Sequence, residues 1–280
     1  MMATLGPARI RALAAELDLR PTKRLGQNFV TDPNTVRRIA RLAGVGPQDV
    51  VLEVGPGLGS LTLALLETGA RVEAVEIDRR LAELLPRTVA ELDPDADLSV
   101  RCADAVAMRP SDLRPTKFVA NLPYNTGVPI LLNVLQCFES VLSGVVMVQA
   151  EVADRLTAQP GSRVYGVPSV KLAWWATARS LGRVGTEVFW PAPKVQSGLV
   201  GFERHPVTDP HLREDTFAAI DAAFAQRRKM LRSALRSWAA PLPAAQVLQA
   251  AGIDPARRGE SLTVAQFRAL ASAKSQLLSP

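Results

Sequence analysis

The sequence of 280 residues predicts an α/β protein with a doubly wound, mostly parallel sheet and a small all-helical domain after it. Between Val50 and residue 149, short apolar runs alternate with stretches of helical periodicity, which is typical of βαβ units. After His205 the periodicity is only helical. We therefore expect one domain over residues 1–204 and a second over 205–280.

Caps and spacing predict the individual elements. Asp32 and Pro33 begin a helix that ends at Gly44, and the apolar run 50–54 is a strand that leads into a glycine loop at 55–59. The other elements of the first domain are strands at 71–77, 98–102, 118–120 and 144–149, helices at 60–67, 79–91 and 128–138, and a terminal hairpin of 183–189 with 195–203. The second domain has helices at 213–239, 243–251 and 261–274.

Composition excludes several classes of protein. With 48% hydrophobic residues and only short apolar runs, the chain is neither largely disordered nor membrane-spanning. Arg9, Arg11 and Glu16 interrupt the N-terminal segment, so we expect no signal peptide and a cytoplasmic protein. Cys102 and Cys137 are too few for a disulfide framework, and we interpret both as buried packing residues.

The positive charge lies at the two ends of the chain. The net charge is +4 over residues 1–40, −3 over 41–203 and +5 over 204–280. A basic N-terminal arm (residues 1–40) and a basic C-terminal domain predict that a polyanion is gripped from the flanks. A solvated surface that keeps the protein soluble stays open as the alternative.

The glycine loop after the first strand predicts a nucleotide-like cofactor. Gly55, Gly57 and Gly59 let the backbone turn tightly and approach a ligand. A dinucleotide fingerprint requires glycine at position 60, where this chain has Ser60. The pattern Glu-x-Gly-x-Gly-x-Gly that begins at Glu53 is typical of S-adenosyl-L-methionine (SAM) sites. We therefore expect SAM rather than NAD, and no metal.

Acidic residues at the next strand ends fit the same cofactor. Glu76 lies 21 residues after Gly55, where a carboxylate accepts hydrogen bonds from both ribose hydroxyls. Asp104 ends the following strand and is placed to accept from the adenine amino group. Taken singly, Glu76 and Asp104 are also compatible with ordinary helix N-caps.

The next strand end carries the residues that we expect to act on the substrate. An exocyclic amino group of adenine is a poor nucleophile, so a site must accept its hydrogens and direct its lone pair toward the methyl group. Asn121 and the carbonyl of Leu122 or Pro123 are suitable acceptors, and Tyr124 offers a stacking face for an extruded base. Positioning and dipoles carry this chemistry, and a strong base is not needed.

Together these motifs resemble those of the KsgA-type ribosomal RNA adenine dimethyltransferases. The resemblance extends from about residue 20 to 270. It implies SAM-dependent transfer of four methyls to the N6 atoms of two adjacent adenosines in a hairpin loop near the 3′ end of 16S ribosomal RNA, by a protein that we expect to be a monomer. It rests on the segments Gly26–Phe29, Glu53–Gly59, Asn121–Tyr124, Phe189–Val195 and Phe224–Leu231, with Glu76 and Asp104.

The same resemblance implies further site residues. Asn28 and Val30 close over the methionine part of SAM, and Phe189 stacks on the target base opposite Tyr124. For Phe189 a core aromatic at a strand end is the alternative.

A basic stretch in the second domain predicts RNA contact. Read as one helix, it places Arg228, Arg232 and Arg236 on a single stripe, where they grip RNA phosphates together with Arg227 and Lys229. A solvated helix face is the alternative.

Three other functions stay open. They are a large-subunit ribosomal RNA adenine methyltransferase of the resistance type, a non-catalytic RNA-binding assembly factor on a methyltransferase fold, and a DNA adenine methyltransferase, for which the second domain is small.

Overall fold

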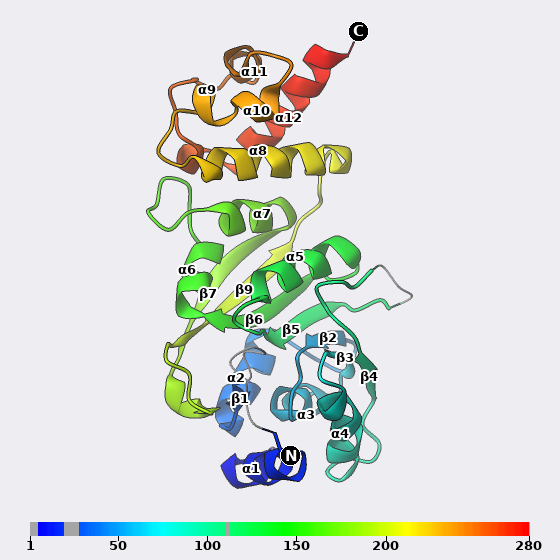
Figure 1. The fold of residues 1–280 in the computed structure, drawn as a ribbon. Helices are drawn as coiled ribbons and strands as arrows, with labels where there is room; N and C mark the ends of the chain where they lie inside the picture. The colour runs from blue at the N-terminus through cyan, green and yellow to red at the C-terminus, as the bar shows by residue number, and fades with distance from the viewer. Residues whose placement is uncertain (1–4, 20–27, 110–112, 280) are drawn as a thin grey trace. The chain divides into compact units, whose positions relative to one another are not determined.

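The computed structural model describes residues 5–19, 28–109 and 113–279. The chain divides into two compact units (Figure 1). Unit 1 comprises residues 1–154 and 178–204, and unit 2 comprises 155–177 and 205–280. The last passage of the chain from unit 1 to unit 2, at residues 204–205, lies at the boundary expected from the sequence. Residues 155–177 belong to unit 2, whereas the sequence analysis placed them in the first domain.

Unit 1 is built on a seven-stranded sheet in the order β4-β3-β2-β5-β6-β9-β7. The pairs from β4 to β6 are parallel, and β9 runs antiparallel to β6. The order reverses between β2 and β5, which is the point where open α/β sheets bind ligands. The predicted α/β fold is confirmed. The strands are β2 (Val50–Val54), β3 (Arg71–Glu76), β4 (Leu98–Cys102), β5 (Lys117–Asn121), β6 (Ser143–Gln149), β7 (Ala176–Val184) and β9 (Ser197–Arg204).

The helices that connect these strands begin and end close to the predicted residues. Asp32 caps α2 (Pro33–Leu42) by accepting from the N–H of Thr35 over 2.9 Å, and Gly44 follows the helix with φ +60°. The others are α3 (Ser60–Leu66), α4 (Arg79–Ala90) and α5 (Gly127–Cys137).

Helix α1 (Pro7–Glu16) lies inside the basic arm and was not predicted. Its residues Ile10, Leu13 and Ala14 are buried in the core of unit 1. Ion pairs of Arg9 with Glu91 and of Glu16 with Arg87 join it to the region of α4.

The predicted hairpin is only partly correct. β9 does have a neighbouring strand on its outer side, but that strand is β7, over residues 176–184 rather than 183–189. Residues Phe189–Trp190 instead form β8, which pairs antiparallel with β1 (Phe29–Val30). The short helix α6 (Ala150–Leu156), which follows β6, was also missed.

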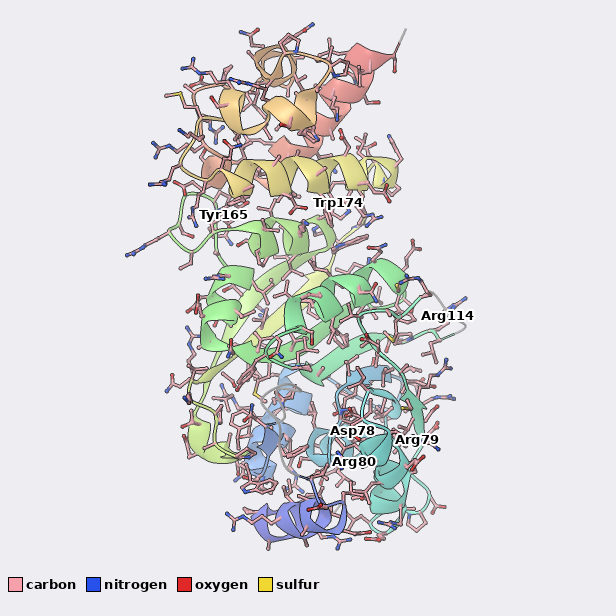
Figure 2. All side chains as sticks on the ribbon, viewed as in Figure 1. Asp78, Arg79, Arg80, Arg114, Tyr165 and Trp174 are labelled. Atoms are coloured by element: carbon pink, nitrogen blue, oxygen red, sulfur yellow. The ribbon has the colours of Figure 1, made fainter. Side chains whose placement is uncertain are left out.

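The described part of unit 2 outside β7 is helical (Figure 1). Tyr165 lies in the loop before α7 (Val167–Trp175), as Figure 2 shows. Its hydroxyl donates to the Leu262 carbonyl over 2.9 Å. The helices are α6 in its last two residues, α7 (Val167–Trp175), α8 (Arg213–Ala225), α9 (Leu231–Ala234), α10 (Arg236–Ala239), α11 (Ala244–Ala250) and α12 (Val264–Leu278).

The single helix predicted over 213–239 is wrong. Helix α8 ends at Ala225, and the main-chain N–H groups of Leu231 and Arg232 donate to the carbonyls of Arg257 and Pro255, over 2.8 and 3.1 Å. These tertiary bonds replace the helical ones, and the sequence does not reveal them. None of the helices in the described residues is long and apolar enough to cross a membrane.

Candidate functional site

A pocket of about 390 Å³ opens at the carboxyl ends of β2, β3 and β5, where the strand order reverses. This volume is in the range of small-ligand and cofactor sites. The lining contains most of the residues that were predicted from the sequence to bind the cofactor or substrate. They are Asn28, Val30, Gly55, Gly57, Glu76, Asp104 and Asn121–Tyr124.

The glycine loop lies against the pocket in a conformation that other residues rarely adopt. Gly57 has φ +59°, and an added Cβ would lie 2.9 Å from the ring of Phe29. Gly59 has φ +97°, and a Cβ there would lie 2.7 Å from the Leu85 side chain. Gly55 and Gly57 line the pocket, while Gly59 lies outside its lining and allows α3 to approach α4.

The carboxylate of Glu76 is fixed at the end of β3. Its Oε2 accepts from the N–H of Gly57 over 3.1 Å, and Oε1 accepts from the N–H of Asp78 over 3.0 Å. Burial raises its pKa, and these main-chain bonds oppose the shift. Asp78, not Glu76, caps α4, so the N-cap interpretation of Glu76 is wrong. Each Glu76 oxygen keeps lone pairs for further donors.

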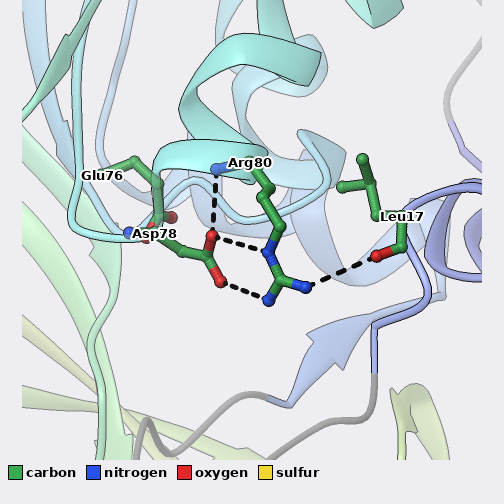
Figure 3. A network of polar contacts seen from close by, with 4 residues as sticks. All are labelled: Leu17, Glu76, Asp78 and Arg80. Carbon is green, nitrogen blue, oxygen red and sulfur yellow. Dashed lines mark hydrogen bonds and ion pairs between the residues drawn. The ribbon is translucent and has the colours of Figure 1, made fainter.

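A second polar network lies behind Glu76 (Figure 3). Arg80 donates to both oxygens of Asp78, from Nη2 over 3.0 Å and from Nε over 3.3 Å. The same guanidinium approaches the carbonyl of Leu17, at the C-terminal end of α1, over 3.4 Å. Asp78, two residues after Glu76, is therefore held by Arg80, which also contacts the end of α1.

Asp104 lies exposed at the mouth of the pocket. Its Oδ1 accepts from the N–H of Val106 over 2.9 Å, in a turn rather than a helix cap. Ile77 also lines the pocket, is 56% exposed, and was not predicted as a site residue. An exposed large apolar side chain at this position offers a surface against which the ring of a ligand can pack.

The two cysteines differ in exposure. Cys102 is exposed and Cys137 only partly buried, so the buried-packing interpretation is wrong for Cys102.

Glu53 lines the same pocket and was not predicted as a ligand. It is 1% exposed, and its Oε2 accepts from the Thr62 hydroxyl over 2.7 Å. Burial raises the pKa of Glu53 to about 8, and the nearby charge of Glu76 adds to the shift. A carboxyl group at the first position of the glycine motif was visible in the sequence, but its burial was not.

Asn121 ends β5 with its amide held at one end. Nδ2 donates to the main-chain oxygen of Asn28 over 3.2 Å. Within residues 5–19, 28–109 and 113–279, Oδ1 of Asn121 has no hydrogen-bond partner. The acceptor end of the amide is thus available at the pocket.

The residues after Asn121 form a turn with one more unpaired acceptor. The Pro123 carbonyl accepts from the N–H of Thr126 over 3.3 Å, whereas the Leu122 carbonyl has no partner in the part of the chain that the structure describes. The Tyr124 hydroxyl lies 3.0 Å from the Ser197 hydroxyl of β9. Burial raises the pKa of Tyr124, so its hydroxyl remains protonated.

Phe189 lies outside the lining of this pocket. It is 5% exposed, belongs to the core of unit 1, and pairs with Val30 in the β1–β8 register. Next to it, Phe29 stacks on Trp190 with ring centroids 6.3 Å apart. The core-aromatic alternative therefore describes Phe189 in this conformation, and its stacking role stays a prediction.

The whole-chain comparison decides the family. The sequence matches the ribosomal RNA adenine dimethylase family over residues 19–276. The chain belongs to this family. It is accordingly a ribosomal RNA adenine dimethyltransferase, and SAM is the methyl donor of this family's chemistry. A ribosomal RNA small subunit methyltransferase A from Leifsonia xyli is 59% identical over 273 residues, which cover 96% of this chain and 98% of that protein.

Solved structures agree with this family at the level of the fold. A dimethyladenosine transferase from Plasmodium falciparum superposes with a TM-score of 0.74 and 21% identity, covering 86% of this chain and 95% of that one. The 23S rRNA methyltransferase ErmE gives a TM-score of 0.65 and 25% identity, covering 89% and 100%. The fold is therefore shared with a protein whose name specifies 23S ribosomal RNA.

The five basic residues that were predicted to contact RNA lie in unit 2 of this dimethylase, on separate elements. Arg228 and Lys229 are exposed between α8 and α9, Arg232 is on α9, and Arg236 is on α10. The prediction that Arg228, Arg232 and Arg236 share one helical stripe is wrong. Arg227 is partly buried and donates from Nε to Glu260 over 2.7 Å. Among the described residues, no cluster of His, Cys, Asp and Glu is suited to hold a metal ion.

Proposed function

We propose that the protein transfers methyl groups from SAM to the N6 atoms of two adjacent adenosines in a hairpin loop near the 3′ end of 16S ribosomal RNA. The substrate is the RNA within the small ribosomal subunit, so the reaction takes place in the cytoplasm. The single observation that carries this proposal is Asn121. Among the residues that the structure describes, its Oδ1 has no hydrogen-bond partner, and the other end of the amide donates to the main-chain oxygen of Asn28 beside the pocket.

The pocket fits SAM at several independent points. Glu76 is held by two main-chain N–H groups and keeps lone pairs for the ribose hydroxyls. Ile77 offers an apolar face for the adenine ring, and the remaining oxygen of Asp104 is placed to accept from its amino group. Gly57 allows close approach of the backbone. Asn28 and Val30 also line the pocket, and we propose that they close over the methionine part of SAM.

Asn121 and Leu122 provide acceptors for the target amino group. When bound, SAM supplies a methyl group activated on a sulfonium. Asn121 Oδ1 and the Leu122 carbonyl each accept one hydrogen of the target amino group, which directs the nitrogen lone pair toward that methyl. Because attack removes the positive charge of the donor, dipoles and positioning are sufficient, and the nitrogen loses its proton afterwards.

Tyr124 and Phe189 are proposed to hold the target base. Tyr124 lines the pocket, and its hydroxyl bond to Ser197 fixes the ring for stacking. Phe189 is 5% exposed, so stacking on the second face of the base requires its ring to become accessible.

Labelled SAM with defined ribosomal particles tests the proposal. The protein is incubated with small subunits that lack the modification and, separately, with large subunits, and the labelled nucleosides are analysed. The proposal expects dimethyladenosine at two adjacent positions of 16S RNA. Label in large-subunit RNA would instead support the resistance-type enzyme. Subunit binding without any methylated nucleoside would support a non-catalytic assembly factor.

A further inference from the structure

Residues Asn28 and Phe29 contact two separate parts of the cofactor pocket. The main-chain oxygen of Asn28 accepts from Nδ2 of Asn121 over 3.2 Å. The ring of Phe29 lies against the glycine loop, so closely that a Cβ on Gly57 would be 2.9 Å from it. The N–H of Gly57 in turn donates to Glu76 over 3.1 Å. A displacement of this segment would therefore disturb the glycine loop and the Asn121 amide together.

The strand that carries Phe29 has few hydrogen bonds to hold it. Strand β1 is two residues long and pairs only with β8, where Phe29 lies opposite Trp190. Beyond the pair, the N–H and the hydroxyl of Thr31 both donate to the Val188 carbonyl, over 2.7 and 3.1 Å. A two-stranded ribbon this short is marginal by itself. We therefore expect side-chain packing to fix its position.

Trp190 is placed to supply that packing. Its ring stacks on the ring of Phe29, with centroids 6.3 Å apart and an angle of 22° between the planes. Phe29 is buried and lines the pocket, whereas Trp190 is partly buried and lies outside the lining. Phe29 thus packs against the glycine loop and the Trp190 ring at once. An effect of Trp190 on the cofactor must pass through Phe29.

We propose that Trp190 is a positioning residue for methyl transfer, because its ring holds Phe29 against the glycine loop. This contact keeps the pocket wall in place for SAM and the Asn28 carbonyl within reach of Asn121. Aromatic pairs contribute about 2- to 10-fold in an equilibrium constant beyond the area that they bury. Without the indole, Phe29 is correctly placed in a smaller fraction of molecules, and the apparent affinity for SAM falls with that fraction.

The affinity of the full-length protein for SAM tests the contact. Trp190→Leu keeps an apolar side chain without a ring, and should raise the Kd for SAM about three- to tenfold in calorimetry. Trp190→Phe keeps a ring and should restore most of the affinity. Thr31→Val is the matched control, because it removes the 3.1 Å hydroxyl bond beside the same strand pair but not the ring contact, so its SAM affinity should be unchanged. Melting temperatures establish that each variant is folded during the titration.

A double variant separates positioning from a general loss of stability. If Trp190 acts through Phe29, adding Trp190→Leu to Phe29→Leu should cause little further loss of SAM affinity. Additive losses, an unchanged SAM affinity in Trp190→Leu, or an equal loss in Thr31→Val would overturn the proposal.

Methyl transfer at saturating SAM tests the link to Asn121, and this part rests on the proposed function for its RNA. With small subunits that lack the modification, Trp190→Leu should slow the first transfer about three- to tenfold, and Trp190→Phe should restore it. A normal rate in Trp190→Leu would overturn that link. If the unaltered protein transfers no methyl group to these subunits while SAM affinity changes as expected, the proposed function fails and the positioning of Phe29 by Trp190 stands.

Discussion

The side-chain amide of Asn121 donates from Nδ2 to the main-chain oxygen of Asn28 over 3.2 Å. This bond joins the end of β5 to the residue that precedes β1, which are 93 residues apart in the chain. It fixes the orientation of the amide, so that Oδ1 is the end without a partner among the described residues. Asn121 and the segment that begins at Asn28 are therefore positioned together.

Replacing Glu76 by Gln should weaken SAM binding at least roughly tenfold. The amide has one acceptor oxygen in place of two, and a lost hydrogen bond to a charged group costs about 1.5–3 kcal/mol. Calorimetry with SAM measures the change. Glu83→Gln is the matched control, since Glu83 lies exposed on α4 in an ion pair with Arg79. Unchanged SAM affinity in Glu76→Gln would remove Glu76 from the cofactor site.

Glu53 should make the free energy of unfolding fall as pH rises. Its pKa is raised from 4.5 to about 8, so the folded protein binds this proton over a window in which the unfolded chain has released it. Stability from this group is complete below about pH 4.5 and is lost as the pH rises through about 8. Glu53→Gln should flatten the dependence over that window, as measured by urea unfolding without SAM. A slope identical to that of the unaltered protein would show that Glu53 is ionised at neutral pH.

Tyr124 and Ser197 should act as one unit. Tyr124→Phe and Ser197→Ala remove the same 3.0 Å bond, so the double variant should lose little more methyl-transfer rate than either single variant. Tyr124→Ala should lose more, since a base-stacking contact is worth about 1–3 kcal/mol. Tyr165→Phe, which loses a hydroxyl bond in unit 2, should transfer methyl groups at the normal rate. Additive losses for the Tyr124–Ser197 pair would mean that the bond does not hold the ring.

The sequence predicted the sheet and the pocket well, because each parallel strand is a short apolar run and its end carries a polar residue. Glu76 and Asn121 end β3 and β5, Asp104 follows β4, and the parallel topology brings all three to one pocket. The residues that the sequence did not reveal depend on tertiary contacts. Ser197 reaches Tyr124 only because β9 inserts beside β6, and the two-residue strands β1 and β8 carry too little pattern to predict their pairing.

The error in the basic stretch has a similar cause. Residues 226–236 contain good helix formers with helical spacing, so local propensity predicts one helix. The main-chain bonds from Leu231 and Arg232 to the loop at 255–257 compete with helical bonds and prevail. The burial of Phe189 and the exposure of Cys102 are likewise set by neighbouring segments rather than by residue type.

Methyl transfer by Asn121→Ala tests the account most directly. Single-turnover reactions with small subunits that lack the modification are resolved into mono- and dimethyladenosine, with Asn34→Ala, an exposed asparagine of α2, as the control. We expect normal SAM and subunit binding in Asn121→Ala, and a first transfer slowed by roughly 10²–10³. The second transfer has one N–H left to hold, so it should depend less on whichever acceptor is then unpaired. A near-normal rate of the first transfer in Asn121→Ala would contradict the account.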